Sequence, residues 1–116
     1  MIEQTVFEVL APLVNDRVYP LQIPQSQATY PSVVYTRIAS EPQNRLSVGA
    51  SLDQVRIQID CYDTTYLGAK TLAASVRSAM ENASFKATLQ FDSDFYEAEV
   101  KLYRVMADFY LWQKNA

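Results

Sequence analysis

The hydrophobic period changes abruptly in the middle of the chain, and this change restricts the possible folds more than any other feature. Residues 55–62, VRIQIDCY, alternate between apolar and polar side chains, which is the period of a strand with one covered face. From Tyr66 to Met80 the apolar residues recur instead at every third or fourth position, which is the period of a helix. A strand that passes directly into an amphipathic helix predicts a domain in which a helix packs on a sheet.

The same segment predicts a scaffold, not a reactive centre. Val55, Ile57, Ile59 and Cys61 share one face of the strand, so the only cysteine completes an apolar row. Any of the polar residues 63–65 can cap the helix that follows. The expected buried stripe of this helix consists of Tyr66, Ala69, Leu72, Ala73, Val76, Ala79 and Met80.

The N-terminal part of the chain predicts a helix, an extended segment and a strand. Residues 2–14 carry apolar side chains at helical spacing, and Pro12 and the pair Asn15-Asp16 should end that helix. Residues 17–24 hold two prolines, which confine them to an edge strand or an extended link. Residues 31–40 alternate and predict a strand.

The C-terminal part predicts two further strands. In residues 85–91 the alternation places Phe85, Ala87, Leu89 and Phe91 on one face, and the polar residues 92–94 predict a turn. Residues 95–112 then predict a long strand. Its core row is expected to be Tyr103, Val105, Ala107, Phe109 and Leu111.

These elements predict an α+β fold, a small mainly antiparallel sheet with two helices packed on one face. A length of 116 residues fits one domain, residues 1–116. The second face of such a sheet normally meets water. In the last strand it presents Met106, Tyr110 and Trp112, which are residue types enriched at protein interfaces. We select these three as candidate interface residues; the alternative is that they are scattered over an ordinary surface.

A second candidate contact region is the connection between the two central strands. Residues 41–51 are polar and small and have the length of a projecting arm, although a turn without a partner explains them equally well. Arg37 and Arg45, near this connection, are candidates for contacts with acidic neighbours.

The composition excludes most classes of catalytic site. Without histidine the chain cannot form a Ser-His-Asp or Cys-His system, and most zinc sites are excluded as well. Two glycines are too few for a glycine-rich phosphate loop. Two carboxylate clusters remain, and a helix cap and an acidic surface explain them more simply than a site: Asp60 with Asp63, and Asp92, Asp94, Glu97 and Glu99. We therefore expect no catalytic residue, no metal and no cofactor.

Charge and hydropathy restrict the partners and the location. A net charge of -3 and a pI near 4.8 give no basic surface for gripping nucleic acid. The first residues include Glu3 and Glu8, which do not suit a signal peptide, and no apolar run is long enough for a membrane span. A lone cysteine requires no oxidising compartment, which suits folding in a cytoplasm. We expect a protein that acts away from membranes and does not bind a specific nucleic-acid sequence.

Four segments in order resemble the tail-completion, or tail-terminator, family of long-tailed bacteriophages. They are RVYP followed shortly by PQ, then YPSVVYTRIASEP, VRIQIDCYDTTYLGAKTLAASVRSAM and YRVMADFYLW. The resemblance implies a structural subunit without enzymatic activity that forms a ring, commonly of six copies, on the head-proximal end of the tail tube. Such a ring ends tube polymerisation and provides the surface on which the head connector docks.

The resemblance also implies partners and a location. The partners would be further copies of the chain, the tail tube protein and the head-tail connector proteins, while DNA passes through the ring. The location would be the tail or neck of the virion, assembled in the cytoplasm of the host bacterium. Three alternatives remain at this point: a head-closure or neck connector protein, a small enzyme with a metal at residues 92–99, and a small-molecule binding module.

Overall fold

The structure, a computed structural model, contains two α-helices, one 3-10 helix and five strands in the residues that it describes. It describes residues 2–24, 29–44, 51–85 and 87–115, with side chains for residues 2–24, 29–39, 54–85 and 87–112. The helical elements are α1 (Ile2–Leu10), the 3-10 helix η1 (Ala11–Leu13) and α2 (Tyr66–Glu81). The strands are β1 (Val18–Pro20), β2 (Ser32–Asn44), β3 (Ser51–Asp63), β4 (Thr88–Glu97) and β5 (Leu102–Asn115).

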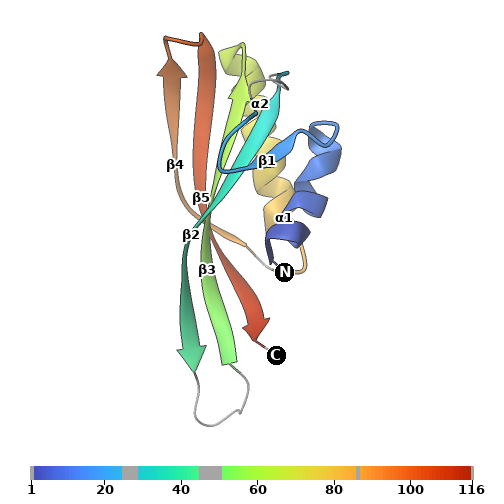
Figure 1. The fold of residues 1–116 in the computed structure, drawn as a ribbon, viewed down its shortest axis with the longest axis vertical. Helices are drawn as coiled ribbons and strands as arrows, with labels where there is room; N and C mark the ends of the chain where they lie inside the picture. Colours follow the sequence, from blue (N-terminus) through green and yellow to red (C-terminus); the bar gives the residue numbers. More distant parts are fainter. Residues whose placement is uncertain (1, 25–28, 45–50, 86, 116) are drawn as a thin grey trace.

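The strands form one sheet in the order β1-β2-β3-β5-β4. β1 pairs parallel with β2, and all other neighbours are antiparallel. Both helices lie on the same side of this sheet (Figure 1). The predicted α+β fold, with a mainly antiparallel sheet and two helices on one face, is therefore confirmed. Residues 17–24 supply an edge strand, as predicted, because β1 lies at the end of the sheet.

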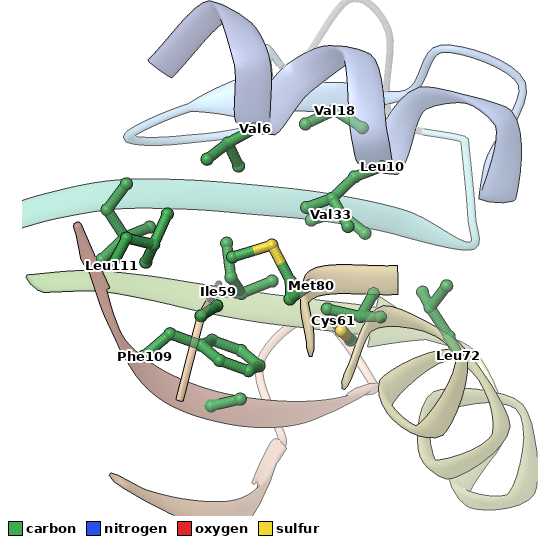
Figure 2. Packing of buried hydrophobic residues seen from close by; sticks show 14 of the residues in the cluster. Val6, Leu10, Val18, Val33, Ile59, Cys61, Leu72, Met80, Phe109 and Leu111 are labelled. Atoms are coloured by element: carbon green, nitrogen blue, oxygen red, sulfur yellow. The ribbon is translucent and has the colours of Figure 1, made fainter. Parts of the chain in front are cut away.

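A single core fills the space between the helices and the sheet. The predicted row of β3, Val55, Ile57, Ile59 and Cys61, has no exposed surface. Figure 2 shows Ile59 and Cys61 of this row among side chains from both helices and from β5. The helices contribute Ile2, Val6 and Leu10 from α1 and Ala69, Leu72, Val76 and Met80 from α2.

The start of α2 differs from the predicted stripe at one residue. Thr65 is the cap, and its hydroxyl accepts a hydrogen bond from the backbone N–H of Gly68. Tyr66, expected in the core, is 48 % exposed. As the first helical residue it reaches toward β4 instead, where its hydroxyl donates to Asp94 Oδ2 at 2.7 Å. Its ring lies 5.7 Å from that of Tyr103, measured between centroids.

The predicted turn at residues 92–94 is wrong, because these residues lie in the middle of β4. The turn comes later, at residues 98–101, where Lys101 has a left-handed φ of 55°. A register shift between Leu89 and Phe91 inserts one extra residue into β4. Because a shift of one residue moves a side chain to the other face of the sheet, the insertion reverses the predicted orientation of Phe91. Phe91 pairs with Asp108 and is 47 % exposed.

Three strands continue beyond the level of the helices (Figure 1). Asn44 at the end of β2 pairs with Ser51 of β3, which pairs in turn with Asn115 of β5. Part of the expected arm is therefore regular strand, because residues 41–44 and 51 extend the ladder between β2 and β3. Residues 45–50 lie outside the described part. The long axis of the molecule measures 52 Å, against 25 and 23 Å for the others.

Candidate interaction surface

The sheet face turned away from the helices is the most extensive candidate contact surface, and we call it the outer face. The cross-strand register defines which side chains share it. They are Ser32, Val34 and Thr36 of β2, Gln54 to Tyr62 at even positions of β3, Phe91, Ser93, Phe95 and Glu97 of β4, and Arg104 to Trp112 at even positions of β5.

The structure places the three candidate interface residues of β5 on this face, in one row. Met106, Tyr110 and Trp112 occupy alternating positions of the strand. Met106 and Tyr110 are half-buried, whereas Trp112 is 40 % exposed. They do not form a continuous apolar patch, because Asp108 lies between Met106 and Tyr110.

Asp108 is buried on the outer face and paired with a cation. Only 2 % of its surface is exposed, and its Oδ2 accepts a hydrogen bond from Arg56 Nε at 2.7 Å. This bond and the charge of Asp108 raise the pKa of the Arg56 guanidinium. The other oxygen, Oδ1, has no hydrogen-bond partner among the described residues. The ion pair offsets the cost of burying the Asp108 carboxylate, which would be large for an unpaired charge.

A second buried carboxylate, Asp60, organises the opposite end of the face. Its Oδ1 accepts from Arg104 Nη1 at 3.0 Å, and its Oδ2 accepts from Gln58 Nε2 at 2.9 Å. Arg104 also donates through Nε to Glu97 at 2.9 Å and lies 4.3 Å from the ring centre of Phe95. One guanidinium thus ties β3, β5 and β4 together. Burial lowers the pKa of Arg104, but the bonds and charges of its partners outweigh this and raise it.

Sequence reasoning missed two aromatic residues of the outer face. Phe95 is 41 % exposed and Phe91 is 47 % exposed, both on β4. Phe91 was expected on the same face as Leu89, and the bulge that turns it outward has no marker such as a glycine. The outer face therefore carries aromatic side chains on two neighbouring strands.

Arg37, one of the two arginine candidates, does not lie on the outer face. Arg37 is in register with Ile57 of the core row, so it lies on the helix side of the sheet, near the β2 edge. Its side chain is 53 % exposed and stands 3.9 Å from Glu3. Arg45 lies outside the described residues. The structure therefore does not join Arg37 to the row of Met106, Tyr110 and Trp112.

The groups with possible chemistry are kept apart or buried. Asp60 lies on the outer face, whereas Asp63 is in register with Tyr103 on the helix side. Burial raises the pKa of the Cys61 thiol to about 12, so it stays protonated at neutral pH. Within the described residues no group of three or more His, Cys, Asp or Glu side chains is placed to hold a metal ion. Nor does any helix in that part have the length and apolar character needed to cross a membrane.

The profile of one protein family, described as tail completion protein gp17, matches residues 6–114. The chain belongs to the tail completion protein gp17 family. Membership makes it a structural protein of phage tails, as the resemblance of the four sequence segments implied. No match was found among curated proteins.

A solved structure has the same fold as this tail completion protein. It is a chain of the virion of a native gene transfer agent particle, 14 % identical in sequence, with a TM-score of 0.66. The match covers 95 % of this chain and 92 % of the other. At this level of identity the likeness concerns the fold, and it extends over nearly the whole length of both chains.

Proposed function

We propose that the protein forms a ring at the head-proximal end of the phage tail tube, where it ends tube polymerisation and provides the docking surface for the head connector. The family match over residues 6–114 carries this proposal. The outer face supports it, because Met106, Tyr110 and Trp112 lie there in one row, beside Phe91 and Phe95.

A ring of this kind requires two different contact patches on each subunit. In a head-to-tail interface each subunit offers one patch forward and another backward, and rotation closes the ring. The outer face and the projecting strand ends, residues 41–44 and 51, are two regions that could serve as such patches. We propose a ring of six copies whose other partners are the tail tube protein and the head-tail connector proteins.

The proposed role requires no catalytic group. Ring formation is stoichiometric, so no residue needs to turn over a substrate, and no cofactor is required. A net charge of -3 is compatible with DNA passing through the lumen without being gripped. We propose the tail or neck of the virion as the final location, with assembly in the cytoplasm of the host bacterium.

The test combines the mass of the purified protein with its binding to tail tubes. Light scattering over a concentration series, alone and with purified tubes, should give a mass of six subunits or six copies bound per tube end. Tubes with bound protein should stop growing when tube subunits are added. A protein that binds purified heads and ignores tubes would instead be a head-closure protein.

A further inference from the structure

Each end of the sheet has a strand edge that no other strand covers in the described part of the chain. β4 is the last strand in the order and pairs only with β5. At the opposite end, β1 pairs with residues 33–35 of β2, which leaves β2 from Thr36 to Asn44 unpaired on that side. Unpaired edges are templates for pairing with another chain, so soluble proteins usually protect them.

The protection is uneven. β1 has two recognised protective features, because it is three residues long and ends in Pro20. β4 is ten residues long and contains no proline. It also exposes large apolar side chains at the sheet edge, Phe91 and Phe95 on the outer face. The free part of β2 exposes Ile38, at 45 %, and it carries two protective features, a bulge between Arg37 and Ala39 and Pro42. The features that protect the β4 edge are a bulge and several acidic residues.

The directions of the strands allow the two edges to join in a ring. Between β2 and β4 lie β3 and β5, and each successive pair is antiparallel, so β4 runs antiparallel to β2. Rotation about a ring axis leaves the sense of the strands unchanged, and an inclination of the strands to that axis, as in β-barrels, offsets the β4 edge along the strand toward the free part of β2. The β4 edge of one subunit would then meet the β2 edge of the next in the antiparallel sense, which is the more stable ladder. The helices of both subunits would lie on the same side.

The charges at the two edges are complementary on the helix side. Arg37 of β2 is in register with Ile57, and Asp92 of β4 is in register with Ala107, which places both on that side. Both residues are exposed, and the contact of Arg37 with Glu3 is long, at 3.9 Å. In a joined sheet, opposite charges would therefore line the same face of the seam.

We propose that neighbouring subunits of the ring join edge to edge, with β4 of one copy pairing antiparallel with the free part of β2 of the next copy. The occupant of each edge is thus a second copy of this chain. The inference rests on the proposed ring, and it assigns the two subunit patches to strand edges in place of the outer face and the projecting strand ends. The strand ends, including the end of β5 near Trp112, then face along the ring axis, where the tube or the connector would dock.

The test reverses one charge on each edge and then mixes the two variants. Arg37→Glu alone brings two carboxylates together at the seam, and Asp92→Lys alone brings two cations together there, so each variant should fail to assemble. We expect the concentration at half assembly, by light scattering or by binding to tail tubes, to rise more than about tenfold for each. An equimolar mixture should assemble again, because alternating copies restore opposite charges at every contact.

Matched controls separate the edges from a general charge effect. Lys101→Glu in the turn and Glu8→Lys on α1 change the net charge equally at exposed positions away from both edges, and should assemble normally. Circular dichroism should show that every variant remains folded. If either edge variant does not fold, the neutral variants Arg37→Gln and Asp92→Asn replace the charge reversals. Each of them should weaken assembly, but by less than a charge reversal would.

The outcomes also separate this inference from the proposed function. If the wild-type protein neither forms a ring nor binds tubes, the proposed function fails. If the wild type assembles and the edge variants assemble equally well, the ring stands and the edge contact is wrong. Loss of assembly in both variants without recovery in the mixture would overturn the edge contact too, because the two charges would then act at different places.

Discussion

Trp112 and Phe109 lie close together on β5 but point to opposite faces, which makes them a matched pair. Phe109 is fully buried in the core, and its truncation to alanine should cost about 3–5 kcal/mol of unfolding free energy. Trp112 is 40 % exposed, so Trp112→Ala should change the stability of the isolated subunit by only about 1 kcal/mol or less. If Trp112 is a contact residue, the same change should abolish tube binding, since hydrophobic interface anchors typically contribute about 2 kcal/mol or more.

Urea unfolding of the isolated subunit and a tube-binding assay measure the two effects separately. A Trp112→Ala subunit that unfolds readily and still binds tubes would contradict the interface role. Phe109→Ala serves as the control, since it should lose tube binding only through unfolding.

The Cys61 thiol should be inert in the folded protein and should make folding sensitive to alkaline pH. Its pKa is raised by burial from 9.0 to about 12, so the folded state disfavours the thiolate. The corresponding stabilisation is complete below pH 9.0 and is lost as the pH rises toward about 12. Thiol labelling at neutral pH should therefore require unfolding.

The pH effect can be assigned to this thiol with Cys61→Ala. Urea unfolding above pH 9.0 should show a smaller loss of stability with pH in the variant than in the wild type. Part of the loss should persist, because burial also raises the pKa of Tyr35 and Tyr62. Fast labelling of the native protein would contradict the buried position of Cys61.

At the scale of elements, the sequence pattern predicted both α-helices and the strands of the sheet, but it misplaced the boundary of the last two strands. The turn lies at residues 98–101, inside the predicted strand 95–112, and not at 92–94. The alternation of β3 and the stripe of α2 follow from burial against a common core, which a single sequence displays directly. The bulge near Leu89 depends on pairing with β5, and the polar residues 92–94 belong to a strand only because that partner supplies the ladder. The aromatic pair on the outer face of β4 could not be found without this register. The ion pairs Arg56–Asp108 and Arg104–Asp60 join positions far apart in sequence, so no local pattern indicates them.

The first turn of α2 should depend on Gly68. A Cβ at this position would lie 2.1 Å from Asp63 Oδ2 and 2.8 Å from Thr65 Oγ1, the cap oxygen. Alanine normally favours a helix over glycine by about 1 kcal/mol, but here the clash with the cap should make Gly68→Ala destabilising. In an Asp63→Ala background the same change should be less harmful. Thermal unfolding of the four proteins checks this, and an equal effect in both backgrounds would contradict the clash.

Arg104 should not be replaceable by lysine. Its guanidinium bonds Asp60 and Glu97 through different nitrogens and lies over Phe95, and a single ammonium group cannot reproduce this planar geometry. Arg104→Lys should lower the melting temperature of the isolated subunit. Arg77→Lys is the control, because its exposed pair with Glu81 contributes little. Equal melting temperatures for Arg104→Lys and wild type would mean that the outer-face network is not rigid.

At the scale of the whole molecule, the helices and the strands contribute side chains to one common core. We therefore expect one cooperative unfolding transition. The cluster includes residues of α1, α2 and the inner strands, and no described element has a core of its own. Circular dichroism reports the helices, whereas the fluorescence of Trp112 reports the far side of the sheet. The two urea curves should coincide. Separate midpoints would mean that the projecting strand ends unfold independently of the helical layer.

The buried ion pairs of the outer face also have a consequence for the speed of docking. Asp60 and Asp108 already have their cationic partners in the free subunit, and hydrogen bonds join Arg56, Gln58 and Arg104 to them. A partner that lands on this face would lose little rotamer entropy there and would not wait for a rearrangement. Association at the outer face should therefore be limited by encounter, with a single kinetic phase whose rate is proportional to partner concentration.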